Sequence, residues 1–376
     1  MAELIKYLER TVQSGASDLF LVTGTPVCMK KGKQMVQLEE QNLSPQEANA
    51  LITSIYKLAR RPQPGDGELK DDDFAFTVGG LSRFRVNAYR QRGTLSAVLR
   101  AVPFGIPDWQ KMHIPPEVME LAKERDGGLV LVTGTAGSGK STTLACILHA
   151  INLHRPGHII TLEDPIEYLH RSAGLNRENG SVREEKCIIS QREISIDTKD
   201  YPSALRACLR QSPDVILLGE MRDQETIQTA MTAAETGHLV LATLHTKGAI
   251  HTVDRIVDAF PGNQQGQIRA QLSMVLKAVV SQQLLTSTEG ETVPAFELMR
   301  VNTDIAALIR SGKTPEIKGS ITGGYRVKEA DKRMFSMDQY IVGELYEKQR
   351  LISSEEAQNH AYNRELLDEM LELVTL

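Results

Sequence analysis

A glycine-rich run between an apolar segment and a helical pattern has the composition of a phosphate-binding loop. The residues predicted to hold the phosphates are Gly134, Thr135, Ala136, Gly137, Ser138, Gly139, Lys140, Ser141 and Thr142. The glycines let backbone N–H groups approach phosphate oxygens without a clash from Cβ. Lys140 supplies a positive charge to the β- and γ-phosphates, and the Ser141 hydroxyl can reach Mg²⁺. The sequence therefore predicts a site for ATP with Mg²⁺.

A second apolar segment, which begins at Asp214, ends in the carboxylate of Glu220. Adjacent parallel strands end at one edge of a sheet, so we expect Glu220 to lie beside the phosphates. There it could orient or deprotonate the attacking water. Asp214, at the start of the segment, is expected to be structural. Arg222 and Asp223 are typical of a solvated turn.

Three carboxylates, those of Glu163, Asp164 and Glu167, follow a third apolar segment within five positions. Such a group is self-repelling unless a cation or an arginine compensates it. This pattern fits a Mg²⁺ site in which Glu163 binds the ion and Asp164 or Glu167 contacts the groups that surround the ion. The alternative is an acidic, solvated loop.

Several arginines could compensate the charge that develops on a transferred phosphoryl group. Arg206 and Arg210 lie four positions apart, on one face of a predicted helix that precedes the Glu220 segment. Other candidates lie on or near predicted strands of the first hundred residues: Arg83, Arg85, Arg90 and Arg100. Most surface arginines have no such role, so the residue types alone do not choose among them.

Three histidines, His238, His245 and His251, surround a fourth apolar segment at residues 239–244. His245 follows that segment directly, as Glu220 follows its own, and could contact the γ-phosphate. Metal binding by all three is conceivable, but their spacing over turn, strand and loop is unlike a ligand motif.

The elements that must position these side chains form two domains. Residues 1–102 are expected to be a small α+β domain, with helices at 2–14 and 44–58 and strands at 18–22, 73–78, 82–91 and 94–101. Ser44 and Glu47 form a capping box for the second helix. Residues 103–116 hold four prolines and one glycine, which is typical of a linker.

The remaining residues have the pattern of an α/β domain. In 117–262, predicted strands at 129–133, 159–162, 215–218 and 239–244 alternate with helices at 141–153, 202–211 and 224–236. This alternation predicts right-handed crossovers and a mostly parallel sheet. Residues 263–376 are expected to be mainly helical.

Composition restricts the class of protein. The chain has 376 residues and a net charge of −5, which offers no bulk attraction for nucleic acid, so no nucleic-acid partner is expected. No apolar run approaches the about 20 residues of a membrane span. The four cysteines are isolated, which is typical of free thiols in the cytoplasm.

Taken together, four segments resemble the signature boxes of the secretion-type ATPases: Walker A, Asp box, Walker B and His box. These segments are 134–141, 161–167, 214–223 and 237–261. Within that superfamily the chain resembles the type IV pilus retraction ATPases. Further matching segments are 15–19, 83–88, 191–193, 204–210, 219–226, 233–238 and 253–261. The resemblance covers essentially the whole chain.

The resemblance implies a homohexameric ring in which a PAS-like N-terminal domain precedes a RecA-like ATPase domain. ATP would lie between the RecA-like domain of one subunit and the PAS-like domain of a neighbour. Glu220 matches the catalytic carboxylate, Glu163 the Asp-box acid and His245 the His box. The arginines that match a phosphate clamp are Arg85, Arg100, Arg206 and Arg210. The implied partner is a pilus platform protein at the cytoplasmic face of the inner membrane.

Two departures from the family pattern bear on function. The segment 171–186 is about a dozen residues longer than expected and has the composition of an exposed loop insertion. The family's retraction element falls at residues 304–309, where its arginine is replaced by Ala306. The second departure leaves two roles open: a retraction motor that works alone, or an accessory motor that works with a paralogous ATPase. A pilus-assembly, secretion or DNA-transfer ATPase and a non-hydrolytic nucleotide sensor are the further alternatives.

Overall fold

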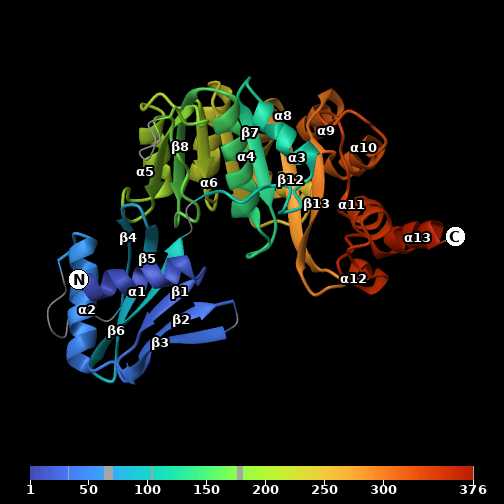
Figure 1. Cartoon of the computed structure of the whole chain (residues 1–376). Coiled ribbons are helices and arrows are strands. Elements are labelled where there is room, and N and C mark those ends of the chain that lie inside the picture. The colour runs from blue at the N-terminus through green and yellow to red at the C-terminus, as the bar shows by residue number, and fades with distance from the viewer. Residues whose placement is uncertain (33, 63–70, 103–104, 176–180, 376) are drawn as a thin grey trace. The chain divides into compact units, whose positions relative to one another are not determined.

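The computed structural model describes residues 1–32, 34–62, 71–102, 105–175 and 181–375 (Figure 1). The chain divides into two compact units. Unit 1 comprises residues 1–105 and 167–170, and unit 2 comprises residues 106–166 and 171–376. Each unit has a hydrophobic core of its own.

In its described residues, unit 1 is a six-stranded antiparallel sheet with two helices. Its strand order is β3-β2-β1-β6-β5-β4. Its elements are α1 (Ala2–Gln13), β1 (Asp18–Leu21), β2 (Pro26–Lys31), β3 (Gln34–Asn42), α2 (Pro45–Leu58), β4 (Asp71–Val78), β5 (Ser82–Gln91) and β6 (Thr94–Val102). The predicted capping box is present, because the Ser44 side chain accepts from the N–H of Glu47 and the Glu47 side chain accepts in return.

The sequence analysis missed β2 and β3. Along β3 only Leu38 is buried, so the strand lacks the apolar alternation that marks a half-buried strand. Its place is set by pairing with β2, which is a contact between segments and not a local pattern.

Unit 2 is built on a seven-stranded sheet in the order β13-β12-β7-β11-β10-β8-β9. The strands are β7 (Gly128–Thr133), β8 (Gly157–Glu163), β9 (Cys187–Glu193), β10 (Val215–Leu218), β11 (Leu239–Leu244), β12 (Leu276–Thr286) and β13 (Thr292–Arg300). All neighbours are parallel except β12 and β13, which pair antiparallel. The four strands predicted from continuous apolar runs are β7, β8, β10 and β11, buried on both faces as expected.

Helices cover both faces of this sheet. One face packs against α5 (Tyr201–Cys208), α6 (Gln224–Glu235), α7 (Ala249–Asp258), α8 (Gly262–Val275), α9 (Thr303–Ser311) and α10 (Ile317–Gly324). The other packs against α3 (Pro116–Met119), η1 (Glu120–Lys123), α4 (Lys140–His154), α11 (Met337–Tyr340), the π-helix η3 (Ile341–Lys348), α12 (Ser354–Asn359) and α13 (Arg364–Thr375). The 3₁₀ helix η2 (Thr314–Glu316) joins α9 to α10. Along β7, Leu129 and Leu131 enter the first core and Val130 and Val132 the second.

The C-terminal region departs from the expected helical pattern at β12 and β13. Residues 263–376 do form helices, but these two long strands extend the sheet beyond β7. The polar run Ser281, Gln282 and Gln283 breaks the apolar pattern of β12, which is why the strand was missed. Figure 1 shows the C-terminal helices next to this edge of the sheet.

The insertion at 171–186 is described at its two ends, and residues 176–180 lie outside the described residues. Leu175 forms an antiparallel bridge with Val182, and Nη1 of Arg183 donates to the carbonyl of Ser172. Both bridge residues are exposed, as expected for a surface loop. Within the described parts of the chain, no helix is long and apolar enough to cross a membrane. All four cysteines are free thiols.

Candidate nucleotide site

The predicted phosphate loop runs from the end of β7 into α4. Thr135, Ala136 and Gly137 at its tip are exposed. Lys140, the first residue of α4, is 8% exposed, and its Nζ donates to the carbonyls of Gly134 at 2.9 Å and Thr135 at 2.7 Å. The ammonium group is therefore held inside the loop at the N-terminus of α4, the end of a helix that favours an anion.

Gln282 of β12 supports this loop, and the sequence analysis missed it. Its side chain is buried, and its Oε1 accepts from the Thr143 hydroxyl at 2.7 Å. Its backbone carbonyl lies so close to Gly134 that a Cβ at that position would meet it at 2.2 Å. Glycine is therefore required at 134 by close approach of another strand as well as by phosphate binding.

The carboxyl ends of four parallel strands bring the other predicted residues to one edge of the sheet. β7 pairs with β11, β11 with β10, and β10 with β8. The phosphate loop follows β7, His245 follows β11, Glu220 lies two residues beyond β10, and Glu163 ends β8. This edge is the usual ligand-binding edge of an open α/β sheet.

Glu220 contacts two side chains. Its Oε1 is 3.3 Å from Nε2 of His245, and its Oε2 accepts from Nε of Arg222 at 2.7 Å. Hydrogen bonding to Glu220 raises the pKa of Arg222. Arg222 is thus a partner of Glu220 and not only part of a solvated turn. Asp223 caps α6, since its carboxylate accepts from the N–H of Thr226 at 2.8 Å.

Glu163 is held by neutral donors. Its Oε1 accepts from the Thr161 hydroxyl at 2.6 Å and from Nε2 of Gln191 at 3.3 Å. Asp164 is exposed beside it, whereas Glu167 belongs to unit 1. Within the described residues, no group of three or more His, Cys, Asp or Glu side chains could hold a metal ion alone. Magnesium beside a nucleotide needs fewer protein ligands, because phosphates and waters complete its coordination.

The hydroxyl of Tyr201 lies near the carboxylates of Glu163, Asp164 and Glu220. Tyr201 begins α5, and its hydroxyl lies 2.7 Å from where a Cβ on Gly219 would be. Burial raises the pKa of Tyr201, and the charges of Asp164, Glu163 and Glu220 raise it further, while Arg222 lowers it. The sequence analysis missed this residue because its place depends on how α5 packs against β8.

The candidate arginines lie in both units. Arg85 and Arg100 are opposite each other on β5 and β6 of unit 1, and Nε of Arg100 pairs with Asp18 at 2.9 Å. In unit 2, Arg206 forms an exposed ion pair with Glu225, and Nη1 of Arg210 donates to the carbonyl of Arg206. Of the two arginines that the resemblance did not select, Arg83 donates to the Thr77 hydroxyl and Arg90 to the carbonyl of Gly93.

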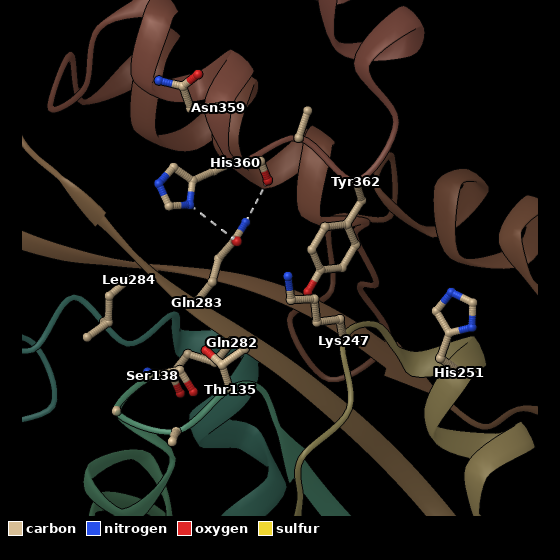
Figure 2. A pocket seen from close by; sticks show the side chains of 13 residues that line it. Thr135, Ser138, Lys247, His251, Gln282, Gln283, Leu284, Asn359, His360 and Tyr362 are labelled. Atoms are coloured by element: carbon tan, nitrogen blue, oxygen red, sulfur yellow. Dashed lines mark hydrogen bonds between the residues drawn. The ribbon is translucent and has the colours of Figure 1, made fainter.

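A cavity of about 700 Å³ adjoins the tip of the phosphate loop (Figure 2). Its floor includes the loop residues 135–138 and the β12 residues 282–284. Lys247 and His251 line one side, and the C-terminal segment 359–362 lines another. Figure 2 shows Gln283 bonded to His360 of that segment, where Nε2 of Gln283 donates to the carbonyl at 2.8 Å. The sequence analysis assigned no site residue C-terminal to His245, so it missed the residues of β12 and of the segment 359–362 that line this cavity.

Residues 2–365 match the family described as Type II/IV secretion system protein. The type IV pilus retraction ATPase PilT of Pseudomonas aeruginosa is 41% identical over 324 residues, which cover 86% of this chain and 90% of PilT. The type IV pilus ATPase PilU of the same organism is 38% identical over 317 residues, covering 84% and 79%. A twitching motility protein of Neisseria gonorrhoeae is 38% identical over 355 residues, covering 94% and 89%.

Solved structures agree with the sequence comparisons. A crystal structure of the pilus retraction motor PilT with bound ADP superimposes with a TM-score of 0.81 at 39% identity, covering 98% of this chain and 99% of that one. The ATPase DotB of Legionella pneumophila gives a TM-score of 0.69 at 26% identity, covering 95% of each chain. The chain belongs to the Type II/IV secretion system protein family.

Proposed function

We propose that this protein is a motor ATPase that powers type IV pilus retraction by hydrolysing Mg-ATP. The observation that carries the proposal is the placement of Glu220 at the same sheet edge as the phosphate loop, in contact with His245. The similarity to PilT over 86% of the chain supports retraction as the task.

In this proposal the loop residues 134–142 bind the phosphates, with Lys140 as the charged group. Ser141 and Glu163 would hold Mg²⁺, and Asp164 would contact the groups that bind the ion without binding it directly. Mg²⁺, when bound, neutralises charge on the phosphate oxygens. Glu220 orients the attacking water and accepts its proton, and His245 fixes the position of Glu220.

The proposed working form is a homohexamer in which Arg85 and Arg100 of one subunit reach the phosphates bound by a neighbour. Arg206 and Arg210 act from the subunit that binds the nucleotide. The similarity to pilus motors supports a place at the cytoplasmic face of the inner membrane, in contact with a platform protein.

Two assays test the proposal. The purified protein should turn over ATP with Mg²⁺, and Glu220→Gln should abolish turnover while nucleotide binding persists. A deletion strain should carry excess pili and lose twitching motility. Nucleotide binding without turnover in the wild type would favour a non-hydrolytic sensor, and absent pili would favour assembly.

An accessory motor is the second candidate, because of Ala306. This residue lies half-buried in the first turn of α9, where the family pattern has arginine, and PilU is 38% identical. Expression in a strain that lacks every other retraction ATPase separates the two roles. Restored motility supports a motor that works alone, whereas motility that returns only with Ala306→Arg supports the accessory role.

A further inference from the structure

A buried carboxylate lies outside the residues assigned to phosphate binding or hydrolysis. Glu297 of β13 is 8% exposed, and burial raises the pKa of its carboxyl group. Its Oε1 accepts from the backbone N–H of Ala249 at 2.6 Å, and the backbone N–H of Met337 donates to the same group. Burying a carboxylate costs free energy unless its oxygens accept hydrogen bonds. Glu297 is satisfied by these two N–H groups, and it therefore holds the backbone at residues 249 and 337 in place.

Ala249 is the first residue of α7, and Gly248 before it has no side chain that could cap the helix. Glu297 therefore supplies the acceptor that a local cap would otherwise provide. Ser281 of β12 supplies a second, since its Oγ accepts from the N–H of Gly248 at 2.9 Å. The two acceptors come from β12 and β13, which the sequence analysis did not predict.

These bonds fix one end of a short connection that carries His245. Residues 245–248 join β11 to α7, and at their other end Leu244 pairs with Thr133 of β7. Inside the connection, the hydroxyls of Thr246 and Thr252 are 2.7 Å apart. His245 thus directly follows the last residue of β11 and lies four residues before Ala249, the first residue of α7, whose start Glu297 and Ser281 hold.

The C-terminal segment covers this helix start. Gly248 has φ +84°, and a Cβ there would meet Cε2 of Tyr362 at 3.4 Å and Oε1 of Glu297 at 3.5 Å. The Tyr362 hydroxyl is 3.4 Å from Oγ of Ser281. Figure 2 shows Tyr362 pointing from the C-terminal segment toward the connection that carries Lys247. The cover excludes water, which would otherwise compete for the N–H groups of residues 248 and 249.

We propose that Glu297 is a positioning residue for ATP hydrolysis, which holds residues 245–248 and thereby keeps His245 against Glu220. The inference rests on the proposed function, because Glu297 affects turnover only through His245. Glu297→Gln keeps one acceptor oxygen but replaces the other with an NH₂ group, which cannot accept from the buried N–H groups of residues 249 and 337. This change favours displacement of the connection. Nucleotide affinity should persist, since the contacts of Lys140 and Gln282 within the phosphate loop involve other residues.

The test uses the full-length protein and two variants, Glu297→Gln and Ser281→Ala, each with and without His245→Ala. Turnover, nucleotide affinity and thermal unfolding are measured for all of them. We expect kcat to fall about tenfold in each single variant, with KM and nucleotide Kd within about twofold of the wild type. Neither variant should lower kcat further once residue 245 is alanine.

Glu344→Gln is the matched control, because it removes a carboxylate of unit 2 whose partners are Arg333 and Lys348. It should lower Tm and leave kcat unchanged. Ser281→Ala removes only a hydroxyl, so it decides the question if Glu297→Gln fails to fold. An unchanged kcat in Glu297→Gln, or in Ser281→Ala where Glu297→Gln does not fold, overturns the role of Glu297. Losses that add fully to that of His245→Ala do the same, and each of these outcomes leaves the proposed function standing. An inactive wild type overturns the proposed function. Unchanged turnover in His245→Ala overturns the role of Glu297, because that role acts only through His245.

Discussion

Arg85 and Arg100 lie directly opposite each other on neighbouring antiparallel strands of unit 1. Side chains at such positions share one face, and like charges placed there repel. Asp18 lies opposite Arg100 on the next strand, and its buried carboxylate pairs with Arg100 at 2.9 Å, so this row of three residues holds one carboxylate and two guanidinium groups. The row retains a positive charge, which a phosphate group from outside the unit would neutralise.

Arg85→Ala should lower kcat at least tenfold if this row serves a phosphate, since loss of an arginine at a transferring phosphoryl group is costly. The Tm should not fall, because the substitution removes a like-charge pair from the sheet. ATPase assays and thermal unfolding check both outcomes. Arg90→Ala is the control from the same strand, where the arginine instead donates to the carbonyl of Gly93. Equal loss in both variants would contradict a specific role for Arg85.

Lys140→Ala should weaken ATP binding by about two orders of magnitude, because the ammonium is the charged group held inside the loop. Titration with a fluorescent nucleotide measures this. Mixing this variant with Arg85→Ala tests the hexamer as well. Mixed rings contain sites with an intact loop and an intact neighbouring arginine, so some activity should return. Activity equal to the sum of the two parents would count against sites shared between subunits.

Gln282→Leu and Thr143→Val should each cost about 1–3 kcal/mol of stability, since each leaves a buried polar group without its partner. The double variant should cost less than the sum, because the two side chains form one hydrogen bond. Denaturant unfolding gives the three values. Nucleotide Kd should rise in parallel if the bond holds the phosphate loop in place. Strictly additive costs would show that the contact is not energetically coupled.

Tyr201→Phe should change the response to alkaline pH. Burial raises the pKa of Tyr201 above its ordinary value of 10.0. A group whose pKa is higher in the folded state contributes stability below its unfolded pKa and loses that contribution as pH rises further. The wild type should therefore lose stability more steeply than the variant above about pH 10. Thermal unfolding from pH 8 to 11 measures the difference, and parallel curves would contradict the placement of the hydroxyl among the acids.

The sequence predicted the elements whose signals are local. β7, β8, β10 and β11 are buried on both faces and therefore read as continuous apolar runs, and each is followed by the residue that it positions. The common edge of Glu163, Glu220 and His245 followed from parallel pairing alone. The family resemblance supplied the choice among the arginines, which residue types could not.

The missed parts depend on contacts between distant segments. β12 carries three polar residues in succession because Ser281 holds Gly248, Gln282 holds the phosphate loop and Gln283 holds His360. Those functions remove the apolar pattern by which a buried strand is recognised. Arg222 was missed for a related reason: a charged residue after a strand looks the same whether it is solvated or paired with Glu220.

The pairing of β12 with β7 also determines when, during synthesis, the sheet around the phosphate loop can form. Ser281 lies opposite Thr133 in the sheet, although about 150 residues separate the two in the chain. Contacts between residues so far apart in sequence form slowly. During synthesis, the strand before the phosphate loop is exposed long before its neighbour exists. A nascent chain that ends before β12 has one side of that strand unpaired and no Gln282 beneath the loop. Nucleotide binding should therefore begin only after most of the polypeptide has been made.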